Sequence, residues 1–340
     1  MASRFTRIRE FVEQEIESRK AAPAGPLSPS QYWLDYNQYS SYVRSLPDEE
    51  LRFIRRHTWH LTGDRYDFYH FISRRAKRDL ISLYESLLPQ LDGFRPQEPP
   101  DGIGVDTPYG RLNSGIVRYA QVLADLIGAR LLPRTGTTRV LELGGGFGGL
   151  ALMCLQWNPS LAYVLCDLEE TLFFEGVFLS LHLGDTRVHL ARQAADLQAL
   201  EPGHVYLLPQ SRAAVLEGMR FDVAINQQSM QEMTEAQVER YCQVLAGSAA
   251  RFYSCNRRSH GAGVVQDKGL IADLHGYLAR RFPVEWDSTD HVSPLARLCL
   301  RNKVARKLIT AFIGKSFLPR GEALLSRFVY RCQASAPASS

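Results

Sequence analysis

The sequence predicts an α/β fold built on a doubly wound, mostly parallel sheet, with an added helical region at the N-terminus. Three observations carry this prediction. Apolar, strand-like runs alternate with helical runs between residues 139 and 332. A glycine-rich turn joins the first of these strands to its helix, and aromatic residues crowd a helical pattern before residue 92. Strands that alternate with helices are typical of parallel sheets whose two faces are covered by helices.

The size and composition are those of an ordinary globular protein. The 340 residues are enough for one large domain with additions, and a net charge of +4 does not indicate a nucleic-acid partner. No apolar run reaches the length of a membrane span, and the first residues are charged and amphipathic, so we expect a cytoplasmic protein. The six cysteines are scattered without metal-ligand spacing, and Cys154, Cys166 and Cys255 fall in predicted core elements. They are expected to be buried thiols.

The first 110 residues are expected to form the helical N-terminal region, which either caps a pocket or provides a dimer surface. Residues 1–20 have helical spacing, 21–30 look like a linker, 29–91 are helical and rich in aromatic residues, and 93–109 are a proline-rich irregular connection. The core of a purely structural helical subdomain is an equally open interpretation of the aromatic residues.

Residues 111–333 are expected to form the α/β domain, which a helix at 114–129 introduces. The predicted strands cover 139–143, 162–166, 204–208, 221–226 and 251–255, and the helices cover 148–157, 169–181, 235–245 and 268–281. Two late strands, 282–287 and 325–332, form a closing pair. The basic insertion between them, 293–320, is interpreted as a solvated amphipathic helix or, alternatively, as a contact for an anionic substrate. Residues 334–340 are expected to be disordered.

The turn after the first strand points to a nucleoside-containing cofactor. Its glycines fit the dinucleotide pattern Gly-x-Gly-x-x-Gly, and Gly144, Gly145 and Gly146 allow the backbone to approach a ligand closely. Glu142 precedes them, and a carboxylate there repels a pyrophosphate but attracts the sulfonium and ammonium groups of S-adenosylmethionine. Asp167, at the end of the second strand, can accept hydrogen bonds from a ribose diol. The pattern therefore favours S-adenosylmethionine and leaves NAD as the alternative.

Three segments resemble one family. They are residues 140–150, residues 163–169 (Tyr-Val-Leu-Cys-Asp-Leu-Glu) and residues 221–233, which read Phe-Asp-Val-Ala-Ile-Asn-Gln-Gln-Ser-Met-Gln-Glu-Met. Together with Tyr241 and the strand that ends at Arg257, they are similar to the sugar O-methyltransferases among the class I S-adenosylmethionine-dependent methyltransferases. The likeness spans about residues 105–260, and Met230 stands where an aromatic residue is common in the family. It implies a Rossmann-like fold and methylation of a hydroxyl of a sugar, glycoside or other polar small molecule, in specialised metabolite or glycan biosynthesis.

Candidate site residues follow from the rule that open α/β sheets bind ligands at the carboxyl ends of their strands. Asn226 and Gln227 are candidates for the methionine part of the cofactor, Leu168 for the adenine, and Arg118 with Tyr119 for closing over the methionine carboxylate. Gln228, Asn256 and Arg257 are candidate substrate ligands. Glu232 is the first candidate general base and His260 the second, because both follow core strands and can take up a proton. A helix-terminal interaction is the structural alternative for Glu232, and ordinary helix packing is the alternative for Arg118 and Tyr119.

Other functions remain open at the level of sequence. A methyltransferase that acts on an amine or hydroxylamine keeps the cofactor and changes the nucleophile. An NAD-dependent oxidoreductase fits the glycines but is disfavoured by Glu142 and by the lack of a Tyr-x-x-x-Lys set. A third alternative is a catalytically silent, cofactor-binding subunit that uses the aromatic N-terminal helices as its interface. No Asp, Glu and His cluster suggests a metal, and the expected partners are a small-molecule acceptor and a second copy of the chain in a homodimer.

Overall fold

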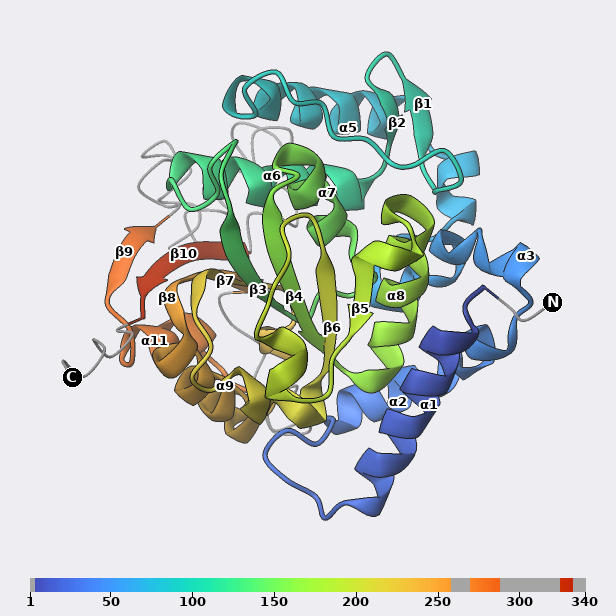
Figure 1. Ribbon diagram of the computed structural model, residues 1–340. Helices are drawn as coiled ribbons and strands as arrows, with labels where there is room; N and C mark the ends of the chain where they lie inside the picture. The colour runs from blue at the N-terminus through green and yellow to red at the C-terminus, as the bar shows by residue number, and fades with distance from the viewer. Residues whose placement is uncertain (1–3, 258–269, 288–324, 333–340) are drawn as a thin grey trace.

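The computed structural model describes residues 4–257, 270–287 and 325–332. Its centre is a sheet in the order β5-β6-β4-β3-β7-β8-β10-β9 (Figure 1). Six neighbouring strands are parallel: β5 (Val188–Leu190), β6 (Val205–Pro209), β4 (Leu161–Asp167), β3 (Thr138–Leu143), β7 (Phe221–Gln227) and β8 (Ala249–Arg257). β10 (Leu325–Arg331) runs antiparallel to both β8 and β9 (Val284–Asp287).

Helices precede and flank this sheet (Figure 1). The N-terminal region contains α1 (Thr6–Ala21), α2 (Gln31–Ser40), α3 (Asp48–Leu51), α4 (Trp59–Thr62) and α5 (Arg74–Leu87), with the 3-10 helices η1 (Ser41–Ser45), η2 (Ile54–His57), η3 (Asp67–His70) and η4 (Leu88–Gln90). The sheet domain contains α6 (Ser114–Gly128), α7 (Gly149–Trp157), α8 (Glu169–Leu183), α9 (Glu235–Ser248) and α11 (Leu274–Ala279). Its 3-10 helices are η5 (Asp185–Arg187), η6 (Ala194–Leu197), η7 (Gln210–Leu216) and η8 (Met230–Glu232).

The pleat of the strands divides the core into two layers. Successive side chains of a strand point to opposite faces, so Val140 packs in a cluster with α1, α6, α7 and α8, whereas Leu141 packs in a second cluster with η7, α9 and α11. The same alternation puts Tyr163 and Leu165 on the α8 face and Val164 and Cys166 on the α9 face. The strands are therefore buried on both sides, as the continuous apolar runs predict.

This architecture confirms the predicted fold class. The parallel strands are wound in both directions from β3, and the chain closes with the antiparallel pair of late strands. That is the Rossmann-like plan of the class I methyltransferases, and helices precede it as expected. Cys154, Cys166 and Cys255 are buried free thiols, also as expected.

Two short pairings were not predicted. The segment 93–109 was expected to be irregular, but β1 (Val105–Thr107) and β2 (Gly110–Leu112) form a hairpin in which Thr107 Oγ1 donates to the Gly110 carbonyl across the turn. The three-residue edge strand β5 was also missed, because its ladder with β6 is too short to leave a period-2 pattern. The predicted insertion 293–320, the tail 334–340 and the first part of the predicted helix 268–281 lie outside the described residues.

Helix α1 is attached to the sheet domain through α8. It buries Ile8, Phe11, Val12 and Ile16, and Phe5, the residue before its first turn, is also buried. At its C-terminal end the Arg19 guanidinium donates to Glu169 Oε2 at 2.5 Å and to Glu170 Oε1 at 2.6 Å, the first two residues of α8. Both glutamates are buried, and they lie at a helix N-terminus where negative charge is favourable. One guanidinium thus neutralises two buried carboxylates about 150 residues away in the sequence.

Replacing Arg19 with Met is expected to lower the free energy of unfolding by about 3 kcal/mol, because it leaves two buried carboxylates without their cation. Urea denaturation measures this loss. The matched control is Lys20→Met, which removes only an exposed ion pair with Glu17 and should change stability by less than about 0.5 kcal/mol. Equal stability of the two variants would contradict the assigned role of Arg19.

Candidate functional site

The loop between β3 and α7 has a backbone that requires glycine. Gly144, Gly146 and Gly148 have φ values of +78°, +66° and +85°, in the left-handed region. Gly148 is the residue before the first turn of α7, and the Gly144 N–H donates to the carbonyl of Cys166 at the end of β4. The loop therefore turns sharply at the carboxyl edge of the sheet and directs the N-terminus of α7 toward the same edge.

Two further glycines are required by space. A Cβ on Gly145 would lie 2.3 Å from Leu165 Cδ2, and a Cβ on Gly149 would lie 2.4 Å from the Phe147 ring and 2.6 Å from the Tyr119 ring. Distances this short cannot be accommodated without moving the neighbours. The loop is consequently packed tightly between β4 and α6.

Glu142 is buried at the end of β3, with 1% of its surface exposed. It accepts a hydrogen bond from Tyr163 Oη at 2.8 Å, from the neighbouring strand β4. Burial raises the pKa of Glu142 to about 8, and the nearby Asp167 adds to the increase. None of the ion pairs found in the described part of the chain involves Glu142, so no paired cation there stabilises its ionised form.

Asp167, at the end of β4, is attached to the loop by its backbone donors. Its carboxylate accepts from the N–H groups of Gly146 at 3.0 Å and Leu168 at 2.7 Å. Burial raises the pKa of Asp167 to about 6 in spite of these two donors. Glu142 and Asp167, two of the residues that the sequence proposes for the cofactor site, both border the glycine-rich loop.

A third carboxyl group at this loop was missed by the sequence analysis. Glu175 of α8 is fully buried, and a Cβ on Gly145 would lie 2.8 Å from its Oε1 and 3.6 Å from Glu142 Cδ. Neither oxygen of Glu175 makes a hydrogen bond of regular geometry among the described residues. The available signal was a single acidic residue in the apolar run Phe173-Phe-Glu-Gly-Val-Phe178, where burial of every neighbour implies burial of the acid.

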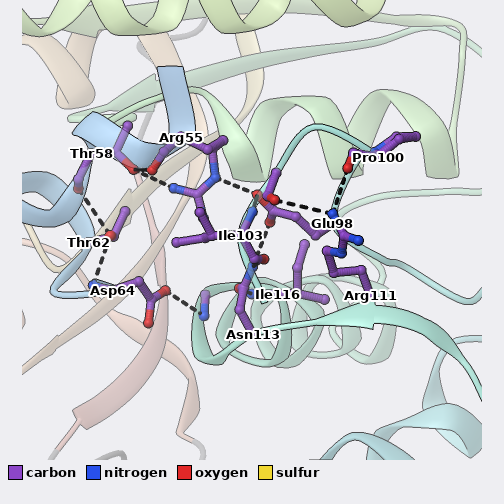
Figure 2. Close-up of polar contacts among 12 residues, drawn as sticks. Arg55, Thr58, Thr62, Asp64, Glu98, Pro100, Ile103, Arg111, Asn113 and Ile116 are labelled. Carbon is purple, nitrogen blue, oxygen red and sulfur yellow. Dashed lines mark hydrogen bonds and ion pairs between the residues drawn. The ribbon is translucent and has the colours of Figure 1, made fainter. Parts of the chain in front are cut away.

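On its other side the loop contacts Arg55 of η2. The guanidinium carbon lies 3.8 Å from the centre of the Phe147 ring. Nε donates to Glu98 Oε1 at 2.6 Å, and Nη1 donates to Thr58 Oγ1 (Figure 2). Nη2 is buried and has no hydrogen-bond partner in the described ranges. A buried cationic nitrogen beside the loop can hold an anionic group of a ligand. No sequence motif marks Arg55, because its partners come from distant segments.

The same network anchors the helix that carries Tyr119. Asn113 caps α6 by accepting from the Ile116 N–H, and it donates to Glu98 Oε2 (Figure 2). Asp64 accepts from the Gly115 N–H at the same helix end. Tyr119 is buried with its ring 6.0 Å from that of Phe147. Its predicted contact with the methionine carboxylate stays a prediction.

Arg118, the neighbour of Tyr119, is half-buried and donates to the Thr62 carbonyl at 3.2 Å. Its guanidinium is therefore held by the N-terminal region. Burial raises the pKa of the Tyr119 hydroxyl to about 12, so it is protonated at neutral pH.

The ends of β7 and β8 form a second polar group, on the α9 face of the sheet. Asn226 Nδ2 donates to the Leu143 carbonyl at 2.7 Å and to Ser229 Oγ, and its Oδ1 accepts from Asn256 Nδ2 at 2.8 Å. Asn256 also donates to Ser254 Oγ. The sequence predicted ligand contacts for both asparagines. Their side chains are largely used to fix the start of the glycine-rich loop and the segment after β7.

The residues that follow Asn226 are more accessible. Gln227 and Gln228 are half-exposed, and Gln227 Nε2 has no partner in the part of the chain that the structure describes. Gln228 has φ +59°, an unusual conformation for a residue other than glycine, and its N–H donates to the Cys255 carbonyl. This strained turn presents its side chains at the carboxyl ends of β7 and β8, beside the loop.

The two candidate bases are placed differently. Glu232 ends the short helix η8 and is half-buried, and its carbonyl accepts from Ser30 Oγ at 3.2 Å, so the linker before α2 runs next to it. Arg257 is exposed at the end of β8, and its N–H donates to Gln231 Oε1. His260 lies outside the described residues. The structure brings Glu232 to the same edge of the sheet as the asparagines.

Within residues 4–257, 270–287 and 325–332, no three His, Cys, Asp or Glu side chains are arranged to hold a metal ion. In the same ranges no helix combines the length and the apolar character that crossing a membrane requires.

Comparison with known proteins supports no assignment beyond the fold. No family model and no curated protein matches the sequence. Similar solved structures include a protein from Galdieria sulphuraria described as a sarcosine dimethylglycine methyltransferase (10% identity, TM-score 0.41, covering 65% of this chain and 86% of that chain). Others are phosphoethanolamine N-methyltransferase 2 from Haemonchus contortus (15%, 0.37, 78% and 59%) and an O-methyltransferase family protein from Burkholderia thailandensis (12%, 0.37, 66% and 62%). At these identities and scores the sheet order remains the basis of the fold assignment.

The buried carboxyl groups predict a distinct pH dependence of stability. Because the pKa of Glu142 is about 8 in the folded protein and ordinarily 4.5, the folded state holds an extra proton between these values. The free energy of unfolding therefore falls as the pH rises from about 5 to 8. Glu142→Gln, which still accepts from Tyr163, should gain on the order of 2–4 kcal/mol relative to the parent protein over this interval. Urea denaturation at pH 5, 6.5 and 8 measures the difference. Substitution of the exposed Glu10 is the control, and an unchanged pH profile in Glu142→Gln would contradict the assignment.

Proposed function

We propose that this chain is an S-adenosylmethionine-dependent methyltransferase that methylates a hydroxyl group of a sugar, glycoside or other polar small molecule. The observation that carries the proposal is the set of buried carboxyl groups against the glycine-rich loop at the carboxyl edge of the sheet. A cationic cofactor compensates these groups, whereas the pyrophosphate of a dinucleotide would be repelled by them. The class I methyltransferase fold agrees with this proposal.

The residues around the loop fit the parts of S-adenosylmethionine. The backbone of Gly144, Gly145 and Gly146 allows close approach, Asp167 would accept from the ribose, and Leu168 would lie against the adenine. Glu142 would favour the positive charge of the methionine part, and Asn226 and Gln227 would border that part. When bound, the cofactor supplies an electrophilic methyl group.

The methionine carboxylate has two candidate partners on the N-terminal side of the loop. Arg55 offers the unpaired Nη2, and Arg118 and Tyr119 lie on α6 next to it. Arg55 is the better placed of the two cations, because its charge is buried against Phe147 and its Nη2 has no other partner in the described residues. This assignment gives the helical N-terminal region, residues 1–110, the role of a cap over residues 111–333.

On the acceptor side, Glu232 would take up the proton of the attacking hydroxyl group, with His260 as the second candidate. Gln228, Asn256 and Arg257 would bind other hydroxyl groups of the acceptor. Glu232 is favoured because it is half-buried and lies directly after the strained turn at Gln228. This role is assigned by position, and the N-terminal linker that contacts its carbonyl would form one wall of the acceptor site.

An amine or hydroxylamine acceptor is the second candidate function, since the proposed cofactor contacts are the same for either nucleophile. Neighbours in structure have been named both N- and O-methyltransferases, which leaves the nucleophile to experiment. The NAD-dependent oxidoreductase is disfavoured by the carboxyl groups at the loop.

A homodimer through the N-terminal helices stays a prediction. Tyr39, Phe68 and Phe71 are 69%, 55% and 88% exposed, which leaves apolar surface on that region. Light scattering of the purified chain measures its oligomeric state directly.

Calorimetric titration separates the two cofactor classes. The titration is carried out at pH 8.5, where Glu142 and Asp167 are largely ionised. S-adenosylmethionine and S-adenosylhomocysteine are expected to bind with dissociation constants in the micromolar range, and NAD at least 100-fold more weakly, because its phosphates meet these two carboxylates. Asp167→Asn should weaken S-adenosylhomocysteine at least tenfold. Preferential binding of NAD would reject the methyltransferase proposal.

The general base is tested by Glu232→Gln. With a panel of glycosides and amines as acceptors and mass spectrometry to detect a gain of one methyl group, the variant should lose about 10²–10⁴-fold in turnover. Its affinity for S-adenosylhomocysteine should not change. Glu235→Gln, three residues away at the exposed start of α9, is the matched control and should keep full activity. Full activity in Glu232→Gln would remove Glu232 as the base and leave His260→Ala as the next variant.

A further inference from the structure

Glu175 is a buried acidic residue, and no other residue of its helix accounts for its burial. It lies in the middle of α8 and has no exposed surface, and its carboxylate oxygens make no hydrogen bond of regular geometry in the described residues. Burial raises the pKa of Glu175, and Asp167 lies close enough for a side-chain hydrogen bond to raise this pKa further. Glu169 and Glu170, on the same helix, are also buried, but each is paired with Arg19. Burial of an acid that has no ion-pair partner among the described residues costs free energy, so a role in folding alone does not account for Glu175.

The side chain is directed at the glycine-rich loop. Oε1 of Glu175 and Cδ of Glu142 approach the same face of Gly145, at 2.8 Å and 3.6 Å from the position that a Cβ would occupy. Asp167 bonds to the next residue, Gly146. Carboxyl groups from three elements (β3, β4 and α8) therefore contact two consecutive residues of the loop. We call Glu142, Asp167 and Glu175 the carboxyl trio.

The charges that surround Glu175 are acidic. Glu142 faces it from β3 and Asp167 from β4, and both raise its pKa further after burial, which is the largest cause. Beside them lie the neutral thiol of Cys166, whose own pKa is raised, and Glu169, whose charge Arg19 neutralises. With the pKa of Glu142 at about 8 and that of Asp167 at about 6, the trio retains protons near neutral pH when no cation is bound.

We propose that Glu175 is a specificity-determining residue that makes the cofactor site select the cationic methyl donor over its neutral, demethylated product. This inference rests on the proposed function. The donor carries a sulfonium charge that the product has lost. A cation at the loop favours the ionised carboxylates, so donor binding expels protons from the trio to the solvent, whereas product binding does not.

The consequence for turnover is direct. Transfer of the methyl group removes the positive charge for which the trio is ionised, and the trio takes protons back. The product is then held less strongly than the donor, and exchange of one for the other is favoured. Affinity for the donor should rise with pH through the interval in which the trio loses its protons, while affinity for the product should depend little on pH.

The test is calorimetric titration of the full chain with sinefungin, an unreactive analogue with an ammonium group in place of the sulfonium, and with S-adenosylhomocysteine. Titrations at pH 6.5, 7.5 and 8.5, in two buffers of different ionisation enthalpy, give affinities and protons released. In the parent protein the ratio of the two affinities should rise about tenfold from pH 6.5 to 8.5, with proton release on binding of sinefungin. In Glu175→Gln the ratio at pH 8.5 should fall about tenfold, equal to about 1.4 kcal/mol, and its pH dependence should flatten.

Glu170→Gln is the matched control, because it removes a buried acid of the same helix that is paired and lies outside the trio, and it should keep the parent ratio. If Glu175→Gln does not fold, Glu175→Met, which places an apolar chain of similar size in the apolar site, replaces it. A parent-like ratio and pH profile in the folded variant would overturn the role of Glu175 and leave the cofactor assignment intact. Failure of the parent protein to bind either compound would reject the cofactor assignment itself, and this inference with it.

Discussion

The structure depends on one close approach, at Gly145, where there is no room for a side chain. β3, β4 and α8 converge on this residue. A Cβ at Gly145 would lie 2.3 Å from Leu165 Cδ2, 2.8 Å from Glu175 Oε1 and 3.6 Å from Glu142 Cδ. The tight contact lets the loop turn at the edge of the sheet, but it also encloses two acids in a medium where ionisation is costly. In the folded protein without ligand, these carboxyl groups therefore stay protonated to a higher pH than carboxyl groups that are exposed to water.

The helical N-terminal region is joined to that same loop by charged side chains rather than by a broad apolar face alone. Arg55 stacks on Phe147 inside the loop. It also donates to Glu98 and Thr58, and Asn113 connects Glu98 to the start of α6 (Figure 2). A buried guanidinium with these contacts fixes one geometry, because each unmade hydrogen bond would be costly. The position of η2 and the position of the loop are thus determined together.

Much of this arrangement could be predicted from the sequence, because its signals are local. Alternation of strands and helices gives the sheet, and glycine spacing with Glu142 and Asp167 gives the loop and two of its acids. What escaped prediction is long-range. The roles of Arg19, Arg55 and Glu175 depend on partners that are distant in the sequence and come close only in the folded protein. The pairing of Asn226 with Asn256 requires two adjacent strands to end in register. The short strand β5 was not predicted for a different reason, since three residues are too few to show a period-2 pattern.

The attachment of α1 to α8 also sets an order of events during synthesis. α1 is synthesised before α8, and the glutamates that bind Arg19 lie about 150 residues later in the chain. At ordinary translation rates of about 5–20 residues per second, α8 follows roughly 8–30 s after α1. During that interval the apolar side of α1 lacks the α8 surface against which it packs in the folded protein. For this period the exposed apolar side of α1 in the nascent chain can associate with other chains or be bound by a chaperone.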